Sequence, residues 1–199
     1  MTAPKTLLEI SGADLTPSPL SASTVVLIDC QMEYLDGKLP LPDCVPALDE
    51  VARLLARARG AGTPIVHIAH KGQPGGAFDR DGHGGRIADK AAPEGDEKVI
   101  EKGLPNAFAG TTLEDELKRI GREQIVLAGF MTHMCVSSTA RCALDLGYRS
   151  TVVADAAATR DLPLPAGGSI DARQLHGASL AELADRFAIV AKTAADLPD

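Results

Sequence analysis

The chain has 199 residues, enough for one sizeable hydrophobic core in one domain. Its formal net charge of −7 disfavours nucleic acid as a partner, because nucleic-acid-binding domains present a basic face. No apolar run approaches the roughly 18 residues of a transmembrane helix, and residues 1–23 lack the apolar core of a secretory signal. We therefore expect a cytoplasmic protein with no membrane partner.

Apolar strand patterns alternate with helical patterns along most of the chain. Residues 1–22, rich in Pro, Ser and Ala, predict an irregular N-terminal arm before a single domain at 23–199. Strands are predicted at 24–29, 63–70, 98–102, 124–129, 148–154 and 187–191, and helices at 45–59, 111–120, 136–146 and 171–185. The strands are continuous apolar runs, which indicates a parallel sheet covered on both faces. The expected fold class is therefore α/β.

Residues 71–97 form a long Gly-rich stretch with no clear period. A loop of this length inside a compact domain is usually functional or disordered. The sequence leaves open whether it closes over a site as a lid.

The four cysteines are Cys30, Cys44, Cys135 and Cys142, and no two of them form a C-x-x-C pair. The usual spacing of a zinc site is therefore absent. On one helix, Cys135 and Cys142 would lie about 10 Å apart along the axis, beyond the roughly 7 Å that a disulfide spans. We expect reduced thiols, most of them packed as small hydrophobic residues.

Polar residues follow most of the predicted strands, at the edge where open parallel sheets bind ligands. We expect these residues to converge: Asp29 with Cys30 and Gln31, His70, Lys102, Cys135 beyond Gly129, and Asp155.

Three of these groups predict an activated nucleophile. Cys135 lies where a strand gives way to a helix. A helix N-terminus and a nearby lysine both favour a thiolate, and a carboxylate can accept the thiol proton. Asp29, Lys102 and Cys135 each have an ordinary reading as a cap, a solvated charge or a core residue. Their joint position at three strand ends indicates a catalytic site.

Three stretches carry a resemblance to the isochorismatase-like cysteine hydrolase superfamily: VLIDCQMEY (26–34), EKGLPNAFAGTTLEDEL (101–117) and GFMTHMCVSSTARCALDLGY (129–148). The resemblance extends from Thr24 to the last strand. It implies a Rossmann-like, three-layer αβα fold with a six-stranded parallel sheet. It also implies a catalytic Asp at Asp29, a catalytic Lys at Lys102 and a nucleophile at Cys135.

The resemblance further implies a non-proline cis peptide bond at Phe130–Met131, a rare conformation in proteins. The backbone N–H groups of Met131 and Cys135 would then form an oxyanion hole. The implied reaction is hydrolysis of a small-molecule amide or ester through a thioester. The alternative is a vinyl ether hydrolase, as in true isochorismatases, with Asp29 as general acid. A non-catalytic fold is disfavoured because all three catalytic residue types are present in order.

Other residues near the three stretches are candidates for the substrate pocket: Gln31, Tyr34, His70, Phe108 and His133. Tyr34 and Phe108 could equally pack in the core, and His133 could be a turn residue. The resemblance implies a homodimer or homotetramer, with residues 71–97 and the N-terminal arm as candidate contacts.

No metal or other cofactor is expected. The stretch HIAHKGQPGG (67–76) lacks the Asp-Trp-His pattern with which the resembling nicotinamidases bind metal. His70 and His83 remain possible metal ligands. We expect Arg141 to form an ion pair on its helix and His176 to be structural.

Overall fold

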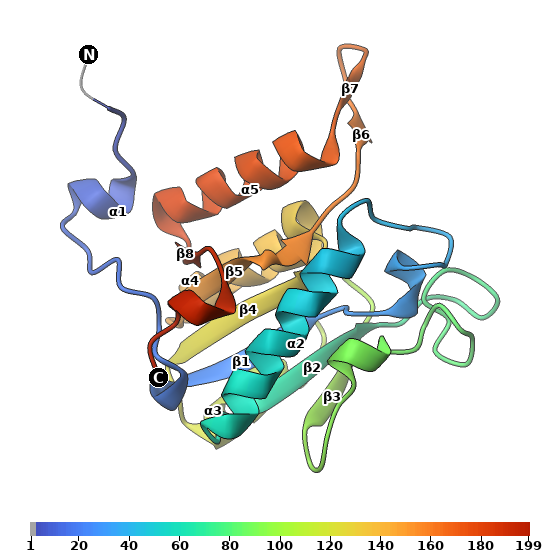
Figure 1. The fold of residues 1–199 in the computed structure, drawn as a ribbon, viewed down its shortest axis with the longest axis horizontal. Coiled ribbons are helices and arrows are strands. Elements are labelled where there is room, and N and C mark those ends of the chain that lie inside the picture. The colour runs from blue at the N-terminus through green and yellow to red at the C-terminus, as the bar shows by residue number, and fades with distance from the viewer. Residues whose placement is uncertain (1–2) are drawn as a thin grey trace.

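Six parallel strands form the central sheet of the computed structural model, which describes residues 3–199 (Figure 1). Their order is β3-β2-β1-β4-β5-β8, with a separate two-stranded hairpin of β6 and β7. The strands are β1 (Ser23–Ile28), β2 (Ile65–His70), β3 (Lys98–Lys102), β4 (Gln124–Phe130), β5 (Arg149–Ala158), β6 (Leu162–Pro163), β7 (Ser169–Ile170) and β8 (Ile189–Ala191). The α-helices are α1 (Leu7–Ile10), α2 (Cys44–Gly60), α3 (Leu113–Ile120), α4 (Ser137–Asp145) and α5 (Ala172–Arg186).

Strand β1 shows why both faces of the sheet are covered. All of its residues are buried, and successive side chains of a strand point to opposite faces. Val25 and Leu27 pack in the core beneath α2, whereas Val26 and Ile28 pack in the core beneath α3 and α4. The predicted α/β fold with six parallel strands is confirmed.

The largest differences from the predicted elements lie at the carboxyl ends of β4 and β5. The helix predicted at 136–146 is α4, preceded by a π-helical turn at Thr132–Val136. Strand β5 continues past the predicted end at 154 to Ala158, with an irregular register opposite Leu127 and Gly129. The β6–β7 hairpin, which projects from the body of the molecule in Figure 1, was not predicted.

The N-terminal arm is more regular than the sequence predicted. Thr6 and Glu9 form a capping box around the short helix α1. The backbone N–H of Leu7 donates to Asp185 Oδ1 at 2.8 Å, so the arm lies near the end of α5 (Figure 1). This contact ties the arm to its own chain.

Strands β1 and β4 approach each other closely at their carboxyl ends. Gly129 pairs with Ile28 and has φ +114°. A Cβ atom at this position would lie 2.0 Å from the Ile28 carbonyl oxygen. Only glycine combines this conformation with this contact.

We expect Gly129→Ala to lower the free energy of unfolding by about 3 kcal/mol, because the added methyl group adds both overlap and backbone strain. Urea unfolding measures this change. Gly177→Ala is the matched control, since a Cβ at Gly177, inside α5, meets nothing within 4 Å. The control should stabilise the chain by about 0.5–1 kcal/mol. Equal effects of the two substitutions would contradict this view of Gly129.

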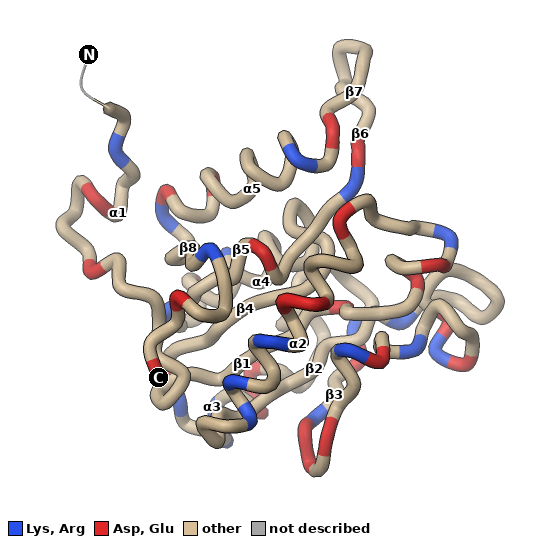
Figure 2. The backbone as a smooth tube through the Cα atoms, in the orientation of Figure 1, with Lys and Arg blue, Asp and Glu red and all other residues tan. Residues whose placement is uncertain are grey.

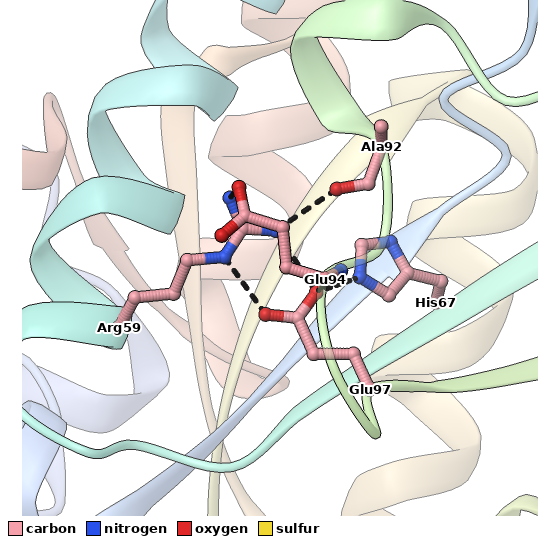
Figure 3. Close-up of polar contacts among 5 residues, drawn as sticks. All are labelled: Arg59, His67, Ala92, Glu94 and Glu97. Atoms are coloured by element: carbon pink, nitrogen blue, oxygen red, sulfur yellow. Dashed lines mark hydrogen bonds and ion pairs between the residues drawn. The ribbon is translucent and has the colours of Figure 1, made fainter.

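A partly buried polar network fixes the segment before β3 to α2 and β2 (Figure 3). Glu97 Oε1 accepts from Arg59 Nε at 2.8 Å, and Glu97 Oε2 accepts from His67 Nε2 at 2.8 Å. Burial alone would raise the pKa of Glu97, but hydrogen bonds from Arg59, the Glu94 backbone N–H and His67 outweigh it and hold this pKa at about 2. Burial lowers the pKa of His67, so its ring is a neutral donor.

We expect Glu97→Gln to lower the free energy of unfolding by about 2 kcal/mol at pH 7, as for loss of hydrogen bonds to a charged group. The folded pKa of Glu97 lies below its ordinary value of 4.5. The stabilisation is therefore present above pH 4.5 and is lost as the pH falls toward 2. Urea unfolding at pH 7 and pH 3 should show the difference from the unmodified chain shrinking in acid. Glu114→Gln, which removes an exposed pair with Lys118, should change stability by less than about 0.5 kcal/mol at both pH values.

Charged residues are mixed over the surface. Figure 2 shows acidic and basic positions interspersed along the helices and loops, in a chain of net charge −7. Within the described residues, no helix combines the length and the apolar character needed to cross a membrane.

Candidate active site

Three strand ends bring Asp29, Lys102 and Cys135 together. Asp29 follows β1, Lys102 is the last residue of β3, and Cys135 lies in the π-helical turn after β4. Asp29 Oδ2 lies 2.7 Å from Lys102 Nζ, and Lys102 Nζ donates to Cys135 Sγ at 3.3 Å. Strand β2 separates β3 from β1, and neighbouring strands lie about 4.8 Å apart. A cation on β3 therefore needs a side chain as long as lysine to reach the other two groups.

The three side chains are almost fully buried, and burial controls their charges. Asp29, Lys102 and Cys135 are 0%, 2% and 4% exposed. Burial raises the pKa of Asp29 to about 6, although the Lys102 ammonium opposes the rise. Near pH 7 the carboxyl group is therefore mostly ionised. Asp29 Oδ1 has no hydrogen-bond partner within residues 3–199, so it is available to accept a proton.

Cys135 differs from the sequence-based expectation of a stabilised thiolate. Burial and the Asp29 carboxylate raise the pKa of its thiol to about 12, and Lys102 only partly offsets them. The resting group is a neutral thiol, so it becomes a nucleophile only if a base removes its proton. Asp29 is the base that the geometry provides.

Asp29 has the left-handed backbone conformation, with φ +51°. Among residues other than glycine, Asp and Asn adopt this conformation most readily. Their short side chains therefore suit this position, where the chain turns sharply after β1.

His70 and Gln31 connect the triad to the long loop at 71–97. Lys102 Nζ lies 3.3 Å from His70 Nδ1, and burial, with the charge of Lys102, lowers the pKa of His70. The Gln31 amide accepts from the His70 backbone N–H at 2.8 Å and donates to the carbonyl of Gly85 at 2.9 Å. Gln31 therefore supports the site through the backbone, and its direct contact with substrate stays a prediction.

An aromatic cluster lies beside the triad. The Tyr34 ring packs edge-on against Phe78 and Phe130, with centroids 5.1 and 5.6 Å apart. Burial, followed by the charge of Asp29, raises the pKa of Tyr34. Phe78 also packs on the His70 ring at 5.1 Å. Tyr34 thus belongs both to the core and to the surroundings of the site.

Phe78 and Glu33 were missed by the sequence-based prediction. Phe78 is 8% exposed, and its backbone N–H donates to the buried Glu33 carboxylate at 3.3 Å. Glu33 also accepts from the Lys38 backbone N–H at 2.6 Å. This carboxylate thereby holds the part of the long loop around Phe78 next to Tyr34 and His70. The signal available in sequence was an aromatic residue inside an otherwise Gly-rich and polar segment.

Phe108 and His133 lie in different surroundings. The Phe108 ring stacks on Tyr148, with centroids 6.0 Å apart, beside the start of β5. That contact matches the packing alternative. His133, two residues before Cys135, bonds through Nδ1 to Thr159 Oγ1 at the end of β5.

The peptide bond between Phe130 and Met131 is cis, as the resemblance implied. The Met131 carbonyl accepts from the N–H groups of Met134 and Val136 at 3.1 and 3.2 Å, which shapes the turn around Cys135. The oxyanion hole itself stays a prediction.

Asp155 does not join the triad, contrary to expectation. It lies in the irregular part of β5, is exposed, and lines a cavity of ≈ 490 Å³ between α2, β5 and α5. The prediction placed the end of β5 too early, so it put the wrong residue at the strand end.

The remaining candidate residues have structural contacts. His83 Nε2 lies 2.7 Å from Asp36 Oδ1, and no cluster of three or more His, Cys, Asp or Glu ligands occurs within residues 3–199. Arg141 pairs with Glu182 on α5, so its ion pair joins two helices. His176 Nδ1 lies 2.8 Å from Thr132 Oγ1. All four cysteines are free.

Residues 23–195 match the family model described as the isochorismatase domain. A secreted isochorismatase effector of Verticillium dahliae is 39% identical over 175 residues, covering 85% of this chain and 89% of that protein. A maleamate amidohydrolase of Pseudomonas putida is 32% identical, covering 68% of this chain and 72% of that protein. The crystal structure of an isochorismatase from Pseudomonas putida KT2440 superposes with a TM-score of 0.93 at 44% identity, covering 98% of this chain and 100% of that chain.

Proposed function

The chain belongs to the isochorismatase family of hydrolases, and from this premise we propose that it is a cysteine hydrolase of a small-molecule amide or ester. The observation that carries the proposal is the buried triad, in which Lys102 Nζ lies 2.7 Å from Asp29 Oδ2 and 3.3 Å from Cys135 Sγ. A neutral thiol beside a mostly ionised carboxylate is a nucleophile paired with its base. Lys102 keeps the carboxylate in place and compensates its charge.

The reaction begins with transfer of the Cys135 thiol proton to Asp29. The sulfur forms a bond to the substrate carbonyl carbon, and the carbonyl π electrons move to oxygen. When this tetrahedral intermediate collapses, the C–N or C–O bond breaks and the protonated Asp29 returns the proton to the leaving group. A thioester remains on Cys135.

Water then completes the cycle. Asp29 accepts a proton from water as the hydroxyl oxygen bonds to the thioester carbon. The C–S bond breaks, the acid is released, and the sulfur regains its proton from Asp29. The backbone N–H groups of Met131 and Cys135 stabilise the oxyanion in both halves of the reaction.

Two observations support the hydrolysis of an amide. One relative, 32% identical, is named a maleamate amidohydrolase. The triad also contains a thiol, which acyl transfer uses and vinyl ether protonation does not need. We propose a small, soluble amide as the substrate class.

Ammonia release from a panel of small primary amides tests this proposal. The unmodified chain should release ammonia from at least one amide, and Cys135→Ala should release none above background. Ammonia release that persists in Cys135→Ala would contradict the thiol mechanism.

Vinyl ether hydrolysis is the second candidate, because Asp29 has a pKa of about 6 and is partly protonated in mild acid. An acid of this kind could protonate a vinyl ether without the thiol. Its rate should fall as the pH rises through about 6, the opposite of the trend for amide hydrolysis. Isochorismate cleavage that survives Cys135→Ala and declines above pH 6 would favour this candidate.

We propose a homodimer or homotetramer in the cytoplasm that uses neither metal nor other cofactor. Sedimentation equilibrium of the purified protein tests the oligomeric state, and metal analysis tests whether a metal is bound.

A further inference from the structure

His70 is the part of the triad's hydrogen-bond network that reaches solvent. It is the last residue of β2 and pairs in register with Lys102 at the end of β3. Its Nδ1 lies 3.3 Å from Lys102 Nζ, whereas its Nε2 has no hydrogen-bond partner among residues 3–199. This Nε2 is not one of the buried unpaired atoms of that range, so it is open to solvent.

Lys102 has no N–H group left for a substrate. A lysine ammonium carries three N–H donors and no acceptor. Three acceptors surround its Nζ, namely Asp29 Oδ2 at 2.7 Å, Cys135 Sγ at 3.3 Å and His70 Nδ1 at 3.3 Å. All the donors of Lys102 are therefore used inside the network, and the next donor along it belongs to the His70 ring.

The contact with Lys102 fixes the tautomer of this ring. Because an ammonium group only donates, Nδ1 of His70 must accept and therefore carries no proton. Burial, and then the charge of Lys102, lower the pKa of His70, so the ring is neutral near pH 7. Its one proton lies on Nε2, and the ring presents a single N–H donor to the solvent side of the site.

Two further contacts hold the ring in place. The Gln31 side-chain amide bonds to both backbone groups of His70, accepting from the N–H at 2.8 Å and donating to the carbonyl at 3.0 Å. Phe78 packs edge-on against the imidazole, with ring centroids 5.1 Å apart. A donor held in this way loses little conformational freedom when it binds an acceptor.

The order of the strands places this donor across the triad from the proposed oxyanion hole. Strand β2 lies on one side of β1, and β4, which leads into the turn with Met131 and Cys135, lies on the other. A scissile carbonyl oxygen in that hole leaves another part of the substrate to face His70. An amide nitrogen is a poor acceptor, because its lone pair is delocalised into the carbonyl group. The matching acceptor therefore belongs to the acyl portion of the substrate.

We propose that His70 is a substrate-binding residue whose Nε2–H, held in this tautomer by Lys102, donates to a second oxygen on the acyl portion of the substrate. The substrate class narrows to small amides that carry a further oxygen acceptor, such as a second carbonyl group. Malonamide is a simple member of this class. The inference rests on the proposed hydrolase for the identity of the scissile bond, but neither the tautomer nor the binding of the acceptor requires the thiol.

Nitrogen-15 NMR of the histidine rings tests the tautomer. The chain has five histidines, and the signals that disappear in His70→Gln are those of His70. Its Nε2 should carry the proton and its Nδ1 should not, with no change between pH 7 and pH 9. A proton on Nδ1 at pH 7 would contradict the contact with Lys102 on which the proposal depends.

Calorimetric titration of the Cys135→Ala protein with malonamide and with butyramide tests binding of the acceptor without catalysis. The two amides are similar in size, but butyramide lacks the second carbonyl group. Malonamide should bind about fivefold more tightly, as for one net hydrogen bond. Adding His70→Gln should retain most of this preference, because glutamine places an N–H donor near the position of Nε2. Adding His70→Asn should remove it, because asparagine reaches only the position of Nδ1.

His83→Asn is the matched control, since that ring is 49% exposed in its pair with Asp36, and it should leave the preference unchanged. The assignment of His70 is overturned by equal affinity for the two amides, by no measurable binding of malonamide, or by a preference that survives His70→Asn or is lost in His83→Asn. The comparison of the two ligands needs no His70 variant, so it remains decisive even if those variants do not fold. Failure of the hydrolase gives a different result, because malonamide would still bind through His70 while the unmodified chain released no ammonia from it.

Discussion

Replacing Cys135 with alanine should lower amide hydrolysis by ~10⁴-fold or more, which removes the reaction from detection in most assays. The thiol is the only group among the three triad residues that can form the covalent bond of the proposed thioester. The free energy of unfolding should change little, because the substitution removes only one heavy atom, the buried sulfur. Initial rates of ammonia release, with thermal unfolding of the same samples, measure both expectations.

Cys142→Ala provides the control for this substitution. Cys142 is also a free thiol and lies in α4, soon after the nucleophile. Among residues 3–199, no hydrogen bond joins it to Asp29 or Lys102. Its removal should leave the rate within about twofold of the unmodified chain, as for a substitution away from the chemistry. Similar losses from both substitutions would show that Cys135→Ala acts through packing rather than through nucleophilic attack.

Asp29→Asn should lower kcat/KM by ~10³-fold, within the range for loss of a general base. Asparagine suits the left-handed conformation at this position, where φ is +51°, so the backbone should keep its course. In the unmodified chain, kcat/KM should rise with pH through about 6, because Asp29 must lose its proton, at a pKa of about 6, before it can accept one from the thiol.

The pH profile of the variant separates a base from a structural residue. The rise near pH 6 should be absent in Asp29→Asn, since asparagine does not titrate. Asp155→Asn should keep both the rate and the rise, because Asp155 is exposed and lies away from the triad. A rise near pH 6 that persists in Asp29→Asn would assign the titration to another group and remove Asp29 from the role of base.

The sheet was predictable because its strands are continuous apolar runs bounded by polar ends. Val25 to Ile28 show this pattern, and every residue of β1 is buried. The end of β5 was not predictable in the same way. Its last residues are mostly alanines, which have no strong strand preference, and their extension depends on pairing with the end of β4.

The triad was predictable because it depends on strand ends and on residue types that chemistry requires. The charge state of Cys135 was not. A helix start and a lysine both suggested a thiolate, but the thiol is 4% exposed and lies beside Asp29. Burial decides between these effects, and the burial of a side chain depends on residues distant in sequence. Phe78 was missed for the same reason, because its significance comes from neighbours contributed by other segments.

The central claim is that Cys135 carries the acyl group with Asp29 as its base. Its most direct test is intact-mass analysis after rapid mixing with p-nitrophenyl acetate, followed by peptide mapping. The account predicts a single acetyl adduct on Cys135, formed faster as the pH rises through about 6, much slower in Asp29→Asn and absent in Cys135→Ala. An adduct on another residue, or ester hydrolysis at an unchanged rate in Cys135→Ala, would contradict it.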